Sequence, residues 1–209
     1  MARVQELYEA VGKGNRKAVE QIIRERLDQG AEAFDLLMQS MIPAMRDLGD
    51  RFSRNEVYVP EMLIAARAMQ TGLVLLEPLI AKTGHQPVGR VCIGTVKGDL
   101  HDIGKNLVAM MLKGAGYSVA DLGVDCDAAK FDKAVQEGAQ AVLLSALLTT
   151  TMPHMKDIVA HFKNRPEVKV IIGGAPVTQQ YADEIGAHGY ADNAGDAVRA
   201  VERALGISA

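Results

Sequence analysis

One stretch of this sequence constrains its fold more than any other: an apolar segment that ends in a polar loop and leads directly into a helix. Residues 91–96 are almost wholly apolar, and the loop after them places His101 between Asp99 and Asp102. Residues 103–112 then show the apolar spacing of an amphipathic helix. A strand that stops at a polar loop before a helix is where open α/β sheets place their ligands. The stretch therefore predicts a ligand loop at the edge of a parallel sheet.

Downstream of this loop, apolar segments alternate with helical ones. The predicted strands are 90–96, 117–122, 141–148, 168–172 and 189–191, and the predicted helices are 103–112, 128–137, 153–163 and 194–205. Continuously apolar strands that alternate with helices predict a parallel sheet covered on both faces. We expect a Rossmann- or flavodoxin-like α/β domain of five parallel strands over residues 87–209.

Upstream of the loop, the apolar spacing is that of helices joined by short connections. Asn15 is placed to cap the second of these helices, and Pro60 to open the fourth. Pro43 lies within the third and is expected to kink or break it. Four helices with such short connections predict a small antiparallel bundle. The predicted fold class of the whole chain is therefore α + α/β. The turn-rich residues 82–89 place the boundary, so that the bundle covers residues 1–86.

Composition argues against several classes of function. A net charge of −3 without a basic stripe provides no footprint for nucleic acid. No run reaches the roughly 18 apolar residues of a membrane span, and the first residues lack the apolar region of a signal peptide. Cys92 and Cys126 form no CxxC pair and indicate a reducing compartment. We expect a cytoplasmic protein that binds neither nucleic acid nor a membrane.

His101 admits two readings from its neighbours alone. A single histidine at a strand-to-helix turn can be purely structural, for example a cap of the following helix. Asp99, two residues earlier, could instead accept a hydrogen bond from the imidazole, as in a metal-ligating histidine. The other histidines are scattered, so a zinc site or a metal hydrolase would lack its three or four ligands. One histidine suffices where a macrocycle fills the other positions of the metal, as in a haem or a corrin.

Two further strand ends would share the same edge of the sheet. Ser145 follows the third apolar run and could be a small core residue, while the threonines at 149–151 could cap the next helix. The pair Gly173-Gly174 follows the fourth strand and could form either a tight turn or the wall of a ligand site.

Three short motifs together resemble the signature of the cobalamin-binding module of methionine synthase and of the corrinoid proteins of methyltransferase systems. They are Asp99-x-His101-x-x-Gly104, Ser145-x-Leu147 and Gly173-Gly174. The resemblance covers nearly the whole chain, because that family also places a four-helix cap before its α/β domain. It implies a cobalamin, B12 or a related corrinoid, bound base-off/His-on, with His101 as the axial ligand to cobalt. It also implies that Asp99 hydrogen-bonds to His101, with Ser145 as the next polar neighbour.

The resemblance implies the other cofactor contacts as well. The residues expected to line the lower face of the corrin are Gly98, Leu100, Asp102 and Ile103. Those expected beside the nucleotide tail are Ser145, Thr149, Gly173, Gly174 and Ala194. The helical bundle would cover the upper face, where Phe52 and Val59 are either apolar contacts to the corrin or ordinary bundle core.

The function implied is that of a methyl carrier in one-carbon metabolism, not catalytic alone. It would accept a methyl group on cobalt from a substrate:corrinoid methyltransferase and pass it to a second methyltransferase, with tetrahydrofolate or a thiol as acceptor. A reductive activator is a further expected partner. The alternative is a cobalamin-dependent sensor or regulator, a class that carries a DNA-binding domain and a tryptophan in the bundle; this sequence contains no Trp. A mutase subunit would normally lack the bundle.

Overall fold

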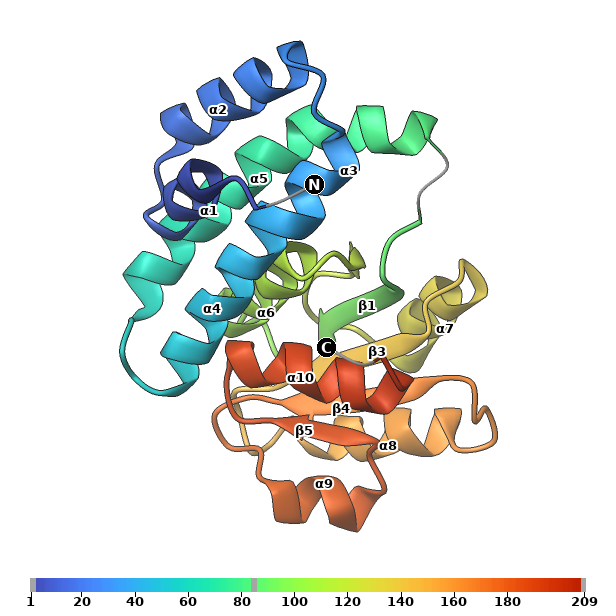
Figure 1. Cartoon of the computed structure of the whole chain (residues 1–209). Coiled ribbons are helices and arrows are strands. Elements are labelled where there is room, and N and C mark those ends of the chain that lie inside the picture. Colours follow the sequence, from blue (N-terminus) through green and yellow to red (C-terminus); the bar gives the residue numbers. More distant parts are fainter. Residues whose placement is uncertain (1–2, 84–85, 208–209) are drawn as a thin grey trace. The chain divides into compact units, whose positions relative to one another are not determined.

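The computed structural model covers the 209-residue chain and describes residues 3–83 and 86–207. Contacts group the chain into two units, Met1–Pro87 with Lys113–Gly116, and Val88–Leu112 with Tyr117–Ala209 (Figure 1). The connection predicted at 82–89 includes residues 84 and 85, which lie outside the described residues.

The first unit is helical, as predicted. Its elements are α1 (Gln5–Gly12), α2 (Arg16–Asp28), α3 (Ala33–Leu36), the π-helical turn η1 (Leu37–Met41), α4 (Ile42–Ser53) and α5 (Val59–Lys82). Asn15 caps α2, since its side chain accepts a hydrogen bond of 3.1 Å from the Ala18 amide. Pro43 lacks the N–H that an uninterrupted α-helix needs, and the wider turn of η1 just before it absorbs this irregularity. The third predicted helix is therefore the continuous segment α3-η1-α4.

Helix α5 supplies much of the core of this unit. Its buried residues are Met62, Ala65, Ala66, Ala68, Met69, Gly72, Leu73 and Leu76, and it contacts α1, α2, α3 and α4. The Glu61 carboxylate accepts a hydrogen bond of 3.1 Å from the Tyr58 amide and so caps the first turn. By length and composition alone α5 could cross a membrane, a test that the core helix of a soluble protein also passes, so this is weak evidence.

The second unit is a five-stranded sheet with helices between its strands. In chain order the elements are β1 (Arg90–Thr95), α6 (Ile103–Gly114), β2 (Ser118–Asp121), α7 (Ala128–Gln136), β3 (Ala141–Ser145), α8 (Pro153–Phe162), β4 (Lys169–Gly173), α9 (Gln179–Ile185), β5 (Gly189–Ala191) and α10 (Ala194–Leu205). The strand order is β2-β1-β3-β4-β5 and every pair is parallel. The predicted Rossmann-like α/β fold is thus confirmed. The order changes direction between β1 and β3, which is the topological switch point of the sheet.

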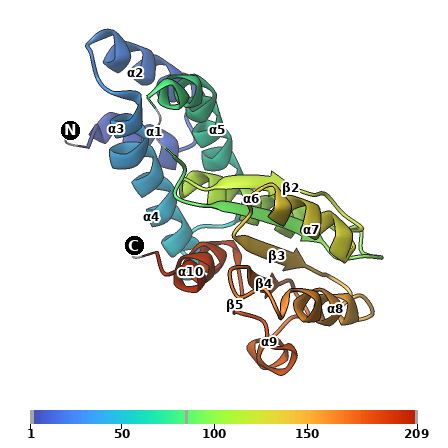
Figure 2. The same ribbon diagram turned by 90° about the vertical axis from the view of Figure 1, so that its right-hand side faces the viewer.

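Helices cover both faces of this sheet. On one face, alternate strand residues pack with α7, α8 and α9 in a core that includes Cys92, Val142, Leu144, Val170, Ile172, Phe131, Phe162 and Ala182. On the other face, Ile171 and Ala200 lie beside Gly189, 3.4 and 3.8 Å from where a Cβ on that glycine would stand. Helix α10 therefore lies on the opposite side of the sheet from α8 (Figure 2). The crossover from β1 to β2 runs in the opposite direction from the later ones, so its right-handedness places α6 on the side of α10.

Two features of this unit differ from the sequence prediction. Strand β3 ends at Ser145, not at residue 148, because the amides of Leu147 and Leu148 donate to a carboxylate instead of to a neighbouring strand. Helix α9 was not predicted at all. It has only seven residues, yet both of its ends carry a signal: the Thr178 side chain accepts from the Tyr181 amide, and Gly186 closes the helix at φ 75°.

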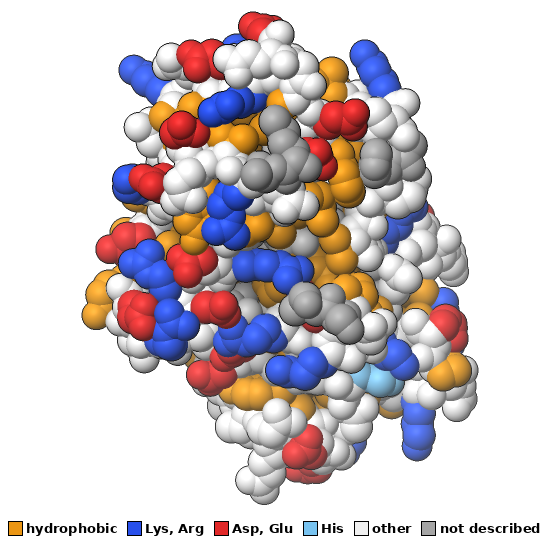
Figure 3. All heavy atoms as spheres, in the orientation of Figure 1, with side chains coloured by type: hydrophobic (Ala, Val, Ile, Leu, Met, Phe, Trp, Pro, Cys, Tyr) orange, Lys and Arg blue, Asp and Glu red, His pale blue; other side chains and the backbone are white. Residues whose placement is uncertain are grey.

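Charged side chains of both signs are interspersed over the face of the molecule drawn in Figure 3. Exposed pairs include Lys13 with Glu9 at 2.9 Å and Arg24 with Glu20 at 2.9 Å, each one helical turn apart. Such pairs are screened by solvent and contribute little to stability. The buried apolar core, and not the surface charges, holds each unit together.

Candidate ligand site

The loop between β1 and α6 carries His101 at the switch point of the sheet, where open α/β sheets bind ligands. The buried Thr95, the last residue of β1, donates a hydrogen bond of 2.8 Å from its hydroxyl to the carbonyl oxygen of His101. The position of the loop is therefore tied to the end of the strand.

Asp99 is the centre of the polar contacts in this site. It is fully buried, at 0% exposure, and its Oδ1 accepts from the His101 amide at 3.1 Å and from His101 Nδ1 at 2.7 Å. Its Oδ2 accepts from the amides of Leu147 and Leu148 at 2.8 and 3.2 Å. The Thr151 hydroxyl lies 2.9 Å from the same Oδ2 and 2.8 Å from the Leu148 carbonyl oxygen; its single proton goes preferentially to the charged acceptor. One carboxylate thus joins the loops that follow β1 and β3.

These contacts keep Asp99 ionised. Burial by itself would raise the pKa of the carboxyl, but the hydrogen bonds from Leu147, His101 and Thr151 outweigh it and hold the pKa of Asp99 well below its ordinary value. A carboxylate can only accept, so Nδ1 of His101 must donate. In the neutral imidazole the free lone pair is then on Nε2. Within the part of the chain that the structure describes, Nε2 has no hydrogen-bond partner, and the His101 side chain is 52% exposed.

Large apolar side chains stand in solvent around His101. Leu100 and Ile103, beside it in the chain, are 71% and 77% exposed, and Leu147 and Leu148, which contact its partner Asp99, are 43% and 42% exposed. Exposed apolar side chains gathered at one place mark a binding site. Among residues 3–83 and 86–207, no group of three or more His, Cys, Asp or Glu side chains is arranged to hold a metal ion. Nε2 of His101 carries a nitrogen lone pair, set among apolar side chains, that could bind the metal of a large cofactor.

The glycines after β4 allow a close approach of backbones at this edge. Gly174 has φ 131°, and a Cβ there would stand 1.9 Å from the carbonyl oxygen of Ala146. A Cβ on Gly173 would stand 2.9 Å from the carbonyl oxygen of Ala191. No side chain fits at either position, so the strand ends meet here through backbone alone.

The predicted residues of the α/β unit all follow the carboxyl ends of strands. The β1–α6 loop and the first turn of α6 hold Gly98, Asp99, Leu100, His101, Asp102, Ile103 and Gly104. The end of β3 and the loop after it hold Ser145, Leu147 and Thr149. The end of β4 holds Gly173 and Gly174, and the first residue of α10 is Ala194. Parallel strands end at one edge, so these residues share it. The Asp102 carbonyl oxygen accepts from the Asn106 amide at 2.7 Å, and the Asp102 carboxylate accepts from the Asn106 side chain at 3.0 Å.

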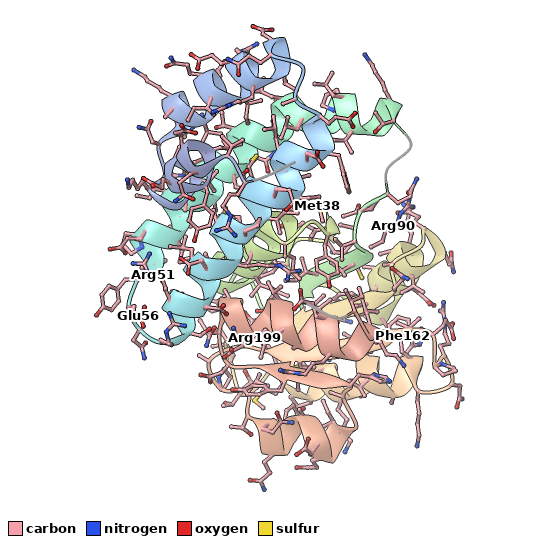
Figure 4. All side chains as sticks on the ribbon, viewed as in Figure 1. Met38, Arg51, Glu56, Arg90, Phe162 and Arg199 are labelled. Carbon is pink, nitrogen blue, oxygen red and sulfur yellow. The ribbon has the colours of Figure 1, made fainter. Side chains whose placement is uncertain are left out.

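Phe52 and Val59 belong to the helical unit, at the end of α4 and the start of α5. Phe52 is partly buried and Val59 is 39% exposed. The turn between them is closed by Arg51 and Glu56, whose Nε and Oε2 atoms lie 3.8 Å apart, and both side chains are labelled in Figure 4. The Glu56 amide also donates to the Arg51 carbonyl oxygen at 2.9 Å.

Sequence reasoning did not single out Thr151, whose hydroxyl lies 2.9 Å from Asp99 Oδ2. Ser145, expected as the next polar neighbour of Asp99, is the last residue of β3 and lies opposite Thr95 and Gly173. Thr151 is 6% exposed, whereas Thr149 and Thr150 are exposed. The sequence has three consecutive threonines at 149–151, but nothing in it distinguishes the hydroxyl of Thr151 from the two before it.

Comparisons with known proteins follow the same division of the chain. Two family models match, both described as a B12 binding domain, one over residues 89–200 and the other over residues 3–77. The chain is 38% identical over 213 residues to a corrinoid protein of Desulfitobacterium hafniense (strain Y51), an alignment that covers 99% of each chain. It is 39% identical over 205 residues to the trimethylamine corrinoid protein of Methanosarcina barkeri, covering 95% of this chain and 94% of that protein.

Solved structures match over both units as well. A cobalamin-binding protein from Desulfitobacterium hafniense DCB-2 aligns with a TM-score of 0.79 and 28% identity, covering 95% of this chain and 96% of the other. A chain of the methanol:cobalamin methyltransferase complex of Methanosarcina barkeri aligns with a TM-score of 0.84 and 26% identity, covering 97% of this chain and 79% of the other.

Proposed function

The chain belongs to the family of corrinoid proteins with B12 binding domains, and we propose that it is the methyl carrier of a corrinoid-dependent methyltransferase system. In this role it accepts a methyl group from a substrate:corrinoid methyltransferase. It passes the group to a second methyltransferase, with tetrahydrofolate or a thiol as acceptor. A reductive activator is proposed as a further partner. The observation that carries the proposal is His101: its Nδ1 donates to the buried Asp99, and its Nε2, set among exposed apolar side chains, has no hydrogen-bond partner among the described residues.

The residues of the site have distinct tasks in this proposal. The bound corrinoid supplies the cobalt that takes up and releases the methyl group. His101 provides Nε2 as the axial ligand, in the base-off/His-on arrangement. Asp99 holds the proton on Nδ1, which fixes the ring orientation and raises the basicity of Nε2. Leu100, Ile103 and Leu147 exclude water from around the imidazole.

The remaining predicted residues are proposed as secondary contacts. Around the corrin and its nucleotide tail these are Gly98, Asp102, Gly104, Ser145, Thr149, Gly173, Gly174 and Ala194. Their shared position at the carboxyl edge of the sheet supports this assignment. In the helical unit, proposed as a cap of residues 1–86 before a cobalamin-binding domain of residues 87–209, Phe52 and Val59 are the apolar contacts, and their partial exposure is consistent with that. We further propose that the protein works in the cytoplasm.

A methyl carrier is preferred to a cobalamin-dependent regulator because of the names of the proteins to which the chain is similar. The relative from Methanosarcina barkeri is named as a trimethylamine corrinoid protein, and one structural match comes from a methanol:cobalamin methyltransferase complex. The second name places its protein in a methyltransferase complex, and the first pairs a corrinoid protein with a methylated amine.

The ligand assignment is tested by the cob(II)alamin EPR spectrum of the full chain. Uniform 15N labelling of the protein should change the superhyperfine splitting, because the axial nitrogen comes from His101. His101→Ala should abolish that change, while His154→Ala, at another exposed histidine that pairs with Asp157 at 3.6 Å, should leave it intact. A spectrum of the wild-type protein that is insensitive to 15N would show that the cofactor keeps its own base.

A further inference from the structure

We propose that Asp125 is a positioning residue for His101, holding the histidine loop from the neighbouring loop that follows β2. The inference rests on the proposed role of His101 as the axial ligand. It concerns a residue on a third strand end, to which the sequence motifs gave no part.

Two hydrogen bonds in opposite directions join the loops. The Gly98 amide donates to Asp125 Oδ1 at 2.8 Å, and the Asp125 amide donates to the Asp99 carbonyl oxygen at 3.1 Å. Gly98 and Asp99 are consecutive, so one residue holds the backbone on both sides of the peptide that leads into Asp99. The carboxylate of Asp99 is held from the β3 side by Leu147, Leu148 and Thr151. Asp125 therefore supplies the contacts from the opposite, β2 side.

The backbone of Asp125 is itself in an unusual conformation. Its φ is 52°, and among the described residues other than glycine only Asn55 also has a positive φ. Left-handed backbone at an L-residue persists where the surroundings determine it, and such positions cluster at functional sites. Here Lys130 of α7 donates from Nζ to the Asp125 carbonyl oxygen at 3.1 Å. The next amide, of Cys126, donates to the Thr95 carbonyl oxygen at 2.9 Å.

Asp125 thus connects α7 and the end of β1 to the loop that orients the imidazole. Its side chain is exposed, so it is not needed for the core. Its contacts to Gly98 and Asp99 instead restrict how far the loop can move relative to the sheet. Without them the Asp99–His101 pair would keep its support from β3 and lose that from β2.

Three variants separate positioning from general stability. Asp125→Gly tolerates φ 52° and removes only the side chain; Asp125→Asn keeps an Oδ1 that accepts from Gly98 and tolerates the same backbone. Asp127→Ala is the matched control, because it also removes one carboxylate from this loop but one that caps α7 by accepting from the Lys130 amide at 3.1 Å. The readouts are the 15N chemical shifts of the His101 ring in the ligand-free full chain, and the affinity for hydroxocobalamin by absorbance titration.

We expect Asp125→Gly to shift the His101 ring nitrogens away from the Nδ1–H tautomer and to weaken hydroxocobalamin binding by about threefold to tenfold, the range for one lost hydrogen bond. Asp125→Asn should restore both readouts, and Asp127→Ala should lower only the resistance to urea. If Asp125→Gly does not fold, Lys130→Met, which removes the exposed contact to the Asp125 carbonyl oxygen, should show the same shift in smaller measure.

Ring shifts in Asp125→Gly equal to those of the wild type, or equally large shifts in Asp127→Ala, would overturn the proposal. Failure of the wild-type protein to bind hydroxocobalamin would overturn the proposed function instead, and the ring shifts of the ligand-free chain would still decide the role of Asp125.

Discussion

At the scale of single residues, Asp99 determines what His101 can do. A buried carboxylate with donors on both oxygens has one stable protonation state, and that state leaves one ring nitrogen of the histidine free. The spacing of two residues made this pair predictable, because both side chains belong to one short loop. The contact to Thr151 was not predictable, since it joins residues 52 positions apart and depends on where β3 ends.

Replacing Thr151 tests the third member of this network. Thr151→Val removes the hydroxyl but keeps the shape, and leaves Asp99 Oδ2 one donor short in a buried place. We expect the free energy of unfolding to fall by about 1–2 kcal/mol, measured by urea denaturation. Thr151→Ser keeps the hydroxyl and should recover most of that loss. Equal stability of the valine variant and the wild type would contradict a stabilising hydrogen bond from the Thr151 hydroxyl to Asp99.

Two glycines of the site should respond in opposite ways to alanine. Gly174→Ala adds a Cβ 1.9 Å from a backbone oxygen at φ 131°, and should cost more than about 3 kcal/mol of unfolding free energy or prevent folding. Gly104→Ala adds a Cβ with no atom within 4 Å, in the first turn of α6, and should stabilise by up to about 1 kcal/mol. Thermal unfolding of both variants checks the pair; similar melting temperatures would contradict the close contact at Gly174.

At the scale of elements, the long periodic segments were predictable and the short or interrupted ones were not. The apolar run after residue 141 reads as strand up to residue 148, but its last residues leave the sheet because Asp99 takes their amides. Helix α9 is too short to show apolar periodicity, and only its caps at Thr178 and Gly186 mark it. Pro43 showed that the third helix would be irregular, but not that a π turn would keep it continuous.

The pairing of β4 with the start of β5 should make stability depend on pH through His188. The Val170 amide donates to His188 Nδ1 at 3.1 Å, so the ring must be neutral there. Burial, with a smaller effect of Lys169, lowers the pKa of His188 below its ordinary value of 6.5. The folded state therefore binds fewer protons than the unfolded state, and this contribution is complete above pH 6.5 and is lost as the pH falls below it.

Urea unfolding at pH 7.5 and at about pH 5.5 measures this effect as the difference between wild type and His188→Gln. We expect the wild type to lose more stability on acidification than the variant, which carries no titrating ring. His154→Gln, at an exposed histidine, is the control and should lose as much stability as the wild type on acidification. An equal loss in the wild type and His188→Gln would exclude His188 as the titrating group.

At the scale of the whole molecule, the fold class followed from the change in periodicity between the two parts of the chain, whereas the ligand followed only from the resemblance of three short motifs to a known family. Both thiols report on the α/β unit, since Cys92 and Cys126 are buried in its core. Burial also raises the pKa of the Cys92 thiol to about 12. In the folded state this thiol is therefore both inaccessible to reagents and protonated, and it should react slowly.

Hydroxocobalamin should therefore protect these thiols from a maleimide, followed by mass spectrometry. A ligand that binds only the folded state lowers the unfolded population by the factor 1 + [L]/Kd, so that labelling slows about 100-fold at 100 times the Kd. In urea concentrations that unfold the chain, hydroxocobalamin should have no effect on the rate. Labelling of the native protein that is equally fast with and without the cofactor would show that binding does not depend on the folded α/β unit.

The span of the Asp99 contacts also bears on the order in which the chain folds and would take up the proposed cofactor. The donors to Asp99 Oδ2 come 48, 49 and 52 positions later in the chain. During synthesis the histidine loop leaves the ribosome long before Thr151 does, and contacts this distant form only after the intervening strand and helices have closed the loop between them. A nascent chain that ends before residue 147 holds Asp99 without any of these three donors. If His101 is the cofactor ligand, as proposed, its network is complete only once the sheet is assembled through β3 and residue 151 has joined it.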